Sequence, residues 1–173
     1  MRLSLVLFAP LLLLWAVVAE VNHTLASLHL CLFAGGLFVA SIALHQPLRP
    51  GLFATLAAAL VCDAHAPVPF GTHFLLFAAA HVFVFRLRDR IPRGDNVATT
   101  VVVLFANLGI FLGLVFVEAR AVSTPASLWP RLLADLIVSQ LALVVVTPWF
   151  FALQARALGL AQTLAAFRSR QAA

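Results

Sequence analysis

The chain contains no lysine and no tyrosine, only two cysteines, and few charged residues of either sign. Charged residues occupy 10% of the 173 positions, whereas a soluble domain carries about a quarter, and 64% of the positions are apolar. One small core cannot hide that much apolar surface, so the composition excludes soluble, disordered and disulfide-framework proteins. The mean hydropathy of +1.08 is typical of an integral membrane protein.

Catalytic motifs are missing as well. The chain has no GxxxxGK[ST] phosphate loop, no GxGxxG turn, no GxSxG nucleophile elbow and no HExxH zinc helix. Cys31 and Cys62 do not form a CxxC pair, and the spacing of the six histidines matches no zinc-ligand pattern. The six acidic residues are scattered and form no carboxylate cluster. We therefore expect no enzyme activity, no metal site and no cofactor.

The chain does contain a series of apolar segments with the length of membrane helices. A helix that rises about 1.5 Å per residue crosses a hydrocarbon core of about 30 Å with about 20 residues. The sequence predicts an all-α membrane bundle of six transmembrane helices, of which the third and fourth are short. A cytoplasmic amphipathic tail is predicted over 154–173, because Leu160, Leu164 and Phe167 share one helical face. The predicted spans are residues 3–19, 25–44, 51–62, 72–85, 97–117 and 136–153.

The arginines predict the orientation of this bundle. With six spans, nine of the 11 arginines fall on one side of the membrane, and only Arg120 and Arg131 fall on the other. Cytoplasmic loops carry the excess of basic residues, so the nine are expected in the cytoplasm, together with both termini. The net charge of +5 is therefore interpreted as an orientation signal.

The densest group of arginines follows the fourth predicted span. It consists of Arg86, Arg88, Arg90 and Arg93, and it is called the basic patch below. Its place just inside the membrane predicts contact with anionic lipid headgroups. No stacking aromatic residues alternate with these arginines, as binding of a single-stranded nucleic acid would require, so no nucleic-acid partner is expected.

Asp63 is the polar residue that interrupts the apolar chain most abruptly. Since the third span is too short to cross the bilayer, the connection from Asp63 to Gly71 is expected to be partly embedded. Pro67 and Pro69 remove two backbone donors there that would otherwise need partners. Two interpretations remain open. Asp63 belongs to a packed polar nucleus or a partner contact, or it caps a loop at a thin outer edge.

Other polar and small residues inside the spans predict close helix packing. Asn107 and Gln140 are expected to make interhelical hydrogen bonds, worth about 1 kcal/mol each. Two small-xxx-small patterns, 36–40 and 109–113, favour close approach of helices. Such contacts form within a bundle as readily as between chains, so a homo-oligomer is left open.

Three features of the chain combine into one pattern. Asp63 closes a predicted span, and Gly71, eight residues later, opens the next, with His73 directly behind it. A Leu- and Ala-rich helix then runs into the basic patch. Near the end, Pro148 stands beside aromatic residues in the last span. This pattern resembles the MreD family, the bacterial rod shape-determining membrane proteins.

The resemblance implies a non-catalytic protein of the bacterial inner membrane. Proteins similar to MreD are thought to bind MreC and other membrane proteins of the elongasome, and to couple MreB filaments to lateral peptidoglycan synthesis. Their fold resembles the six-helix substrate-binding component of energy-coupling-factor vitamin transporters. The alternative is therefore a membrane component of such a transporter that binds a small vitamin.

Overall fold

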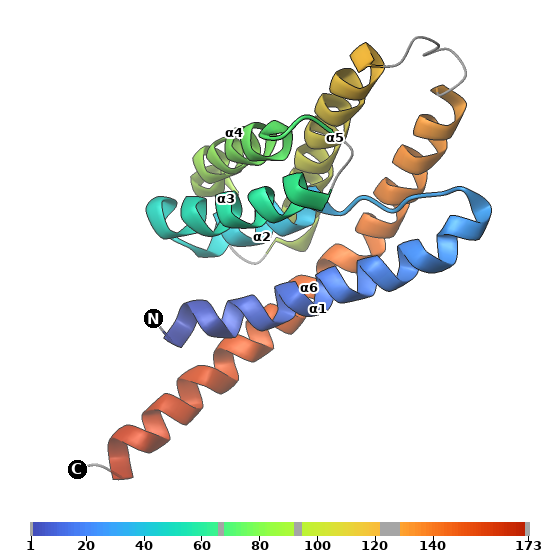
Figure 1. Ribbon diagram of the computed structural model, residues 1–173. Coiled ribbons are helices and arrows are strands. Elements are labelled where there is room, and N and C mark those ends of the chain that lie inside the picture. Colours follow the sequence, from blue (N-terminus) through green and yellow to red (C-terminus); the bar gives the residue numbers. More distant parts are fainter. Residues whose placement is uncertain (1, 66–67, 92–94, 122–128, 172–173) are drawn as a thin grey trace.

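The structure is a computed structural model that describes residues 2–65, 68–91, 95–121 and 129–171. This part of the chain is all helical and contains no β-strand, which confirms the predicted all-α class (Figure 1). In chain order the elements are α1 (Arg2–Leu25), η1 (Ala26–Leu28), α2 (Gly35–His45), α3 (Leu48–His65), α4 (Thr72–Leu87), η2 (Arg88–Arg90), α5 (Asn96–Ala121) and α6 (Trp129–Gln171).

Three stretches of helix are long and apolar enough to cross a membrane. They are Pro10–Leu28, Asn96–Arg120 and Trp129–Ala157. Helix α2 is a shorter apolar helix of 11 residues. The chain therefore has the helices of a membrane protein, while the number of passes and the sides of the two termini stay predictions.

Helix α2 lies at the centre of the fold and packs against α3, α4, α5 and α6. It is apolar around its whole circumference, which is typical of a helix enclosed by protein. Its residues from Gly36 to Ala43 are buried except for Phe38, which is partly exposed. Helices α3 and α4 form a hairpin against it, and α5 packs against both α2 and α4.

Helix α1 lies at the margin of the fold. It packs chiefly against α6, and the two helices cross at an angle (Figure 1). Pro10, Leu11 and Leu14 are buried. Between residues 12 and 24 most side chains of α1 are exposed; Trp15 is 63% exposed and Val17 is 50% exposed. In a membrane, these side chains are available to lipid or to another helix.

The segment predicted as one span over 25–44 is not one helix. The chain follows α1 to Leu25 and η1 to Leu28, and His29 then adopts a left-handed conformation with φ of 55°. Residues Leu30–Ala34 have no helical or strand structure, and α2 begins only at Gly35. We call Leu30–Ala34 the helix break. Its cause is tertiary, and it is described below.

Helix α6 continues without interruption from Trp129 to Gln171. The tail predicted over 154–173 therefore begins within this helix, and no break separates it from the last predicted span (Figure 1). Leu160 is exposed, at 65%. The side chains of Leu164 and Phe167, on which the amphipathic face was predicted, lie outside the described residues.

Glycines set the closest helix contacts. A Cβ added to Gly36 would stand 2.2 Å from the backbone nitrogen of Asn107, so α2 and α5 cross there at a distance that only glycine permits. A Cβ on Gly113 would meet the Leu76 side chain at 2.5 Å, whereas one on Gly109 would meet nothing within 4 Å. Of the predicted small-residue contacts, those at Gly36 and Gly113 are used within the chain.

Candidate functional site

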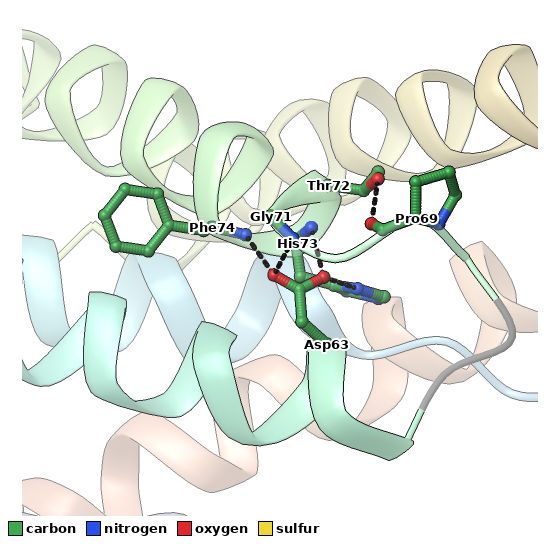
Figure 2. Close-up of polar contacts among 6 residues, drawn as sticks. All are labelled: Asp63, Pro69, Gly71, Thr72, His73 and Phe74. Carbon is green, nitrogen blue, oxygen red and sulfur yellow. Dashed lines mark hydrogen bonds and ion pairs between the residues drawn. The ribbon is translucent and has the colours of Figure 1, made fainter.

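The carboxylate of Asp63 receives four hydrogen bonds from the start of α4 (Figure 2). Its Oδ1 accepts from the backbone N–H of His73 at 2.8 Å and from the His73 ring Nδ1 at 2.9 Å. Its Oδ2 accepts from the backbone N–H groups of Gly71 at 3.0 Å and Phe74 at 3.1 Å. Because a carboxylate only accepts, Nδ1 is a protonated nitrogen of that ring. We call this arrangement the Asp63 cap.

The cap places a negative charge on the positive end of a helix dipole and pairs backbone donors that have no partner within α4. The Asp63 side chain is 0% exposed, so these bonds form away from solvent. Gly71 has φ of 95°, a conformation that L-residues with a side chain rarely adopt. The turn is closed by Thr72 Oγ1, which donates to the carbonyl of Pro69 at 2.6 Å. Asp63 and Gly71 thus fix the start of α4 together, one through its carboxylate and the other through its backbone conformation.

Asp63 therefore forms a packed polar nucleus and caps α4 at the same time. Its buried oxygens are committed to its own chain, and the surface that the cap presents consists of neighbouring apolar side chains. Phe70 in the turn is 74% exposed, and Leu75 in the first turn of α4 is 69% exposed. His73 is buried and packs edge-on against Phe77, with ring centroids 5.8 Å apart.

A second polar centre holds the helix break, and sequence reasoning missed most of it. Asn22 of α1 pairs with both backbone groups of Leu32. Its Oδ1 accepts from the Leu32 N–H at 2.6 Å, and its Nδ2 donates to the Leu32 carbonyl at 3.0 Å. From α6, Asp135 Oδ1 accepts from the Cys31 N–H at 2.8 Å.

Two further backbone donors of this region bond to side chains of α6 and α5. Ser139 Oγ accepts from the Phe33 N–H at 2.9 Å and donates to the Asp135 carbonyl at 2.6 Å. Asn107 Oδ1 accepts from the Gly36 N–H at 3.0 Å and so caps α2 from a neighbouring helix. An unpaired buried N–H costs about 1–3 kcal/mol, so these acceptors make the irregular backbone tolerable inside an apolar protein.

Asn107 was predicted to make an interhelical hydrogen bond, and it does. Gln140 also bonds between helices, because its Nε2 donates to the Leu104 carbonyl at 3.2 Å. Neither Asp135 nor Ser139 was predicted to make such a bond. Asp135 stands just before the predicted sixth span, and Ser139 is a small polar residue within it. Their i, i+4 spacing, which continues to the buried Leu143 and Thr147, is the signal that could have identified this face of α6.

A third polar group joins α3 to α4. His81 is fully buried, and its Nδ1 lies 2.9 Å from Thr55 Oγ1, which also donates to the Gly51 carbonyl at 3.0 Å. A Cβ on Gly51 would come within 3.1 Å of His81 Cε1, so the ring packs against the backbone of α3. His81 Nε2 has no hydrogen-bond partner among the described residues. This group links the two helices of the hairpin.

The basic patch is not one uniform surface. Arg86 and Arg90 are exposed, but Arg88 donates to the Gln46 carbonyl at 3.1 Å and stacks over the Phe85 ring at 4.0 Å. Arg88 Nε also lies 3.6 Å from the exposed Asp89 carboxylate. Arg88 thereby ties the end of α4 to the end of α2. Arg93 lies outside the described residues.

The predicted site residues thus fall in different places. Asp63, Gly71 and His73 come together in the cap, whereas Asn107 lies at the crossing of α2 and α5. Pro148 lies within α6, between the buried Thr147 and a Trp149 that is 73% exposed. Within the described ranges, no three His, Cys, Asp or Glu side chains gather as metal ligands would.

Comparison with known proteins returned no match: no protein-family model, no curated protein and no solved structure is similar to this chain.

Proposed function

We propose that the chain is a non-catalytic membrane scaffold of the bacterial cell-elongation machinery, of the MreD type, which binds an MreC-like partner in the inner membrane. The Asp63 cap supports this proposal. The Asp63–Gly71 spacing, on which the resemblance rests, corresponds to a turn that needs both residues, one for its buried carboxylate and one for its positive φ.

The partner surface that we propose is the apolar rim of the cap. Phe70 and Leu75 are large, exposed and held on a rigid turn, so a partner helix meets a preformed surface with little ordering cost. The proposed arrangement in the membrane has six spans with both termini in the cytoplasm. The exposed Arg86 and Arg90 then contact anionic headgroups.

The vitamin-transporter alternative would require polar side chains free to bind a small molecule. The polar side chains that hold the cap and the helix break form hydrogen bonds within their own chain instead, and among them only Asn107 has a buried polar atom, Nδ2, without a partner among the described residues. Asp63, His73, Asn22 and Ser139 all form such bonds. Their engagement favours the scaffold over the transporter component.

The test is capture of the MreC-like partner in a membrane pull-down. The double variant Phe70→Ala, Leu75→Ala is expected to lose most of the capture while keeping the stability of the wild type. Asp63→Leu is expected to lose capture as well, because the turn that carries both side chains is no longer held. Phe53→Ala is the matched control, since Phe53 is 77% exposed on the same hairpin but lies about 15 Å along α3 from Asp63. Capture that both variants leave unchanged would overturn the proposal.

The orientation has its own test. A reporter joined after Arg93 is expected to be active only in the cytoplasm, because the basic residues around it are retained there. An external signal would contradict the orientation without bearing on the partner surface.

A further inference from the structure

The helix break stands out because the local sequence and the observed backbone disagree. Residues 25–34 contain neither proline nor glycine, and they read as a continuation of the apolar helix that follows them. The structure nevertheless turns the chain out of helix at His29, whose φ is 55°. Such a conflict between local preference and tertiary structure is typical of a functional element.

One bond at the break is local, from the Leu30 N–H to the Leu25 carbonyl at 3.2 Å, and the others are made by side chains of α1 and α6. A helix would pair the N–H groups of Cys31, Leu32 and Phe33 with its own carbonyls. Here they are taken by side chains of α1 and α6 instead. The extended form therefore exists only while α1 and α6 stay in their present places.

Helical and extended forms of this segment differ greatly in length. His29 is left-handed and Ala34 has ψ of 20°, so only the four residues between them can be extended. Four residues span about 13 Å when extended but only about 6 Å as helix. A change to helix would shorten the link between α1 and α2 by about 7 Å. Helix α1 is the element free to follow such a change, since it packs chiefly against α6.

Gly35 and Gly36, at the start of α2, mark the point up to which the backbone of the two forms would differ. Gly36 is fixed by its close contact with the Asn107 backbone, so the core part of α2 stays in place in either form. Asn107 Nδ2, which is buried there, has no hydrogen-bond partner among the described residues. The part that changes is thus confined to the chain before Gly35.

We propose that the helix break is a conformational strap that changes between this extended form and a helix continuous with α2. The change moves the C-terminal end of α1, near Leu25, along α6. Asn22, Asp135 and Ser139 hold the extended form. A ligand or a partner that competes for these side chains, or that binds α1, would shift the balance between the two forms. The device belongs to the chain alone and does not depend on which partner it binds.

The test is a spin-label distance measurement in lipid nanodiscs, in a background with Cys31→Ala and Cys62→Ala. Labels at Val17→Cys and Phe105→Cys report the position of α1 against α5, and both sites are exposed. Labels at Phe53→Cys and Phe105→Cys form the control pair, which reports whether the remaining bundle is intact. Replacing Cys31 keeps its N–H, through which it bonds to Asp135.

The decisive variant combines Asn22→Ala, Asp135→Ala and Ser139→Ala. It is expected to move the α1–α5 distances into a second discrete population, displaced by up to about 7 Å, while the control pair keeps its distance. Adding Gly35→Pro is expected to restore the first population, because proline cannot continue a helix toward its N-terminal side. In the present form a Cβ at Gly35 would stand 2.5 Å from Phe33 Cζ, so the end of that side chain must shift. Gly35→Ala introduces the same Cβ and is therefore the matched control, and it is expected to leave the second population in place.

Three results would overturn the strap. The triple variant could keep the distances of the parent protein, which would show that the extended form needs none of these acceptors. It could give a broad distribution without a second population, which would show loss of order instead of a change between two forms. The control pair could change as well, which would show that the side chains hold the whole bundle.

Discussion

The Asp63 cap and the helix break solve the same physical problem in opposite ways. Each is irregular backbone in an apolar protein, and each needs acceptors for N–H groups that no helix pairs. In the cap, a single carboxylate serves four donors that lie 8 to 11 residues along the chain. In the break and at the start of α2, four side chains from three helices each accept from one backbone N–H; Asn22 lies 10 residues away, and the other three lie 71 to 106 residues away.

The two structures differ in which parts of the chain determine them. The cap is local, so it forms as soon as α3 and α4 meet as a hairpin. The break is distributed, so it exists only when α1, α5 and α6 have assembled around α2. A local structure held by one residue is vulnerable to one substitution, whereas a distributed one loses its bonds one at a time. The predictions below compare the two.

The largest effect is expected from Asp63→Leu. The substitution removes all four bonds to a charged, fully buried acceptor and leaves their donors unpaired. Bonds to charged groups contribute about 1.5–3 kcal/mol each, and the turn relaxes in part, so a loss of about 4 kcal/mol in the free energy of unfolding is expected. Denaturant unfolding of the protein in mixed micelles measures it. A loss below about 1 kcal/mol would mean that the cap contributes little to the fold.

The same contrast explains why the cap could be predicted from the sequence and the helix break could not. Asp63 and Gly71 were recognisable because their spacing is short and their residue types are specific to a capped turn. The break could not be predicted, because its local sequence favours helix and, apart from Asn22, its side-chain acceptors lie 104 and 106 residues away in α6. Asp135 and Ser139 read as ordinary residues at the start of a span until the fold brings them to Cys31 and Phe33.

The next largest effect is expected from Gly36→Ala, at the end of the break where backbone meets backbone. The added Cβ would meet the nitrogen, Cα and Cβ of Asn107 at 2.2 to 2.5 Å, so α2 and α5 must separate. Overpacking of this kind costs about 1–3 kcal/mol, and we expect the upper end of that range in the same unfolding measurement.

The matched control for Gly36→Ala is Gly109→Ala. Gly109 lies in α5, and an added Cβ there meets nothing within 4 Å. We expect no loss of stability at Gly109, because alanine has the higher helix propensity. Equal losses at the two glycines would show that the close crossing of α2 and α5 is not what makes Gly36 necessary.

A smaller effect is expected from Ser139→Ala in the break. It removes the acceptor of the Phe33 N–H and leaves the Asn22, Asp135 and Asn107 bonds in place. A loss of about 1 kcal/mol is expected, well below that of Asp63→Leu. A loss as large as that of Asp63→Leu would show that the break is held by one critical bond, and the distinction between a local and a distributed structure would fail.

The smallest effect is expected from Asp135→Asn, and the sharpest comparison sets it against Asp63→Asn. Each oxygen of Asp63 accepts two bonds, so the amide nitrogen that Asp63→Asn introduces would face donors, and a cost of about 2 kcal/mol is expected. Among the described residues, Asp135 accepts one bond, through Oδ1, and the amide oxygen of asparagine can still accept it. Asp135→Asn is thus expected to change the free energy of unfolding by less than about 0.5 kcal/mol. If the two substitutions cost the same, the charge of Asp135 matters as much as its geometry, and the break depends on an ionised carboxylate as the cap does.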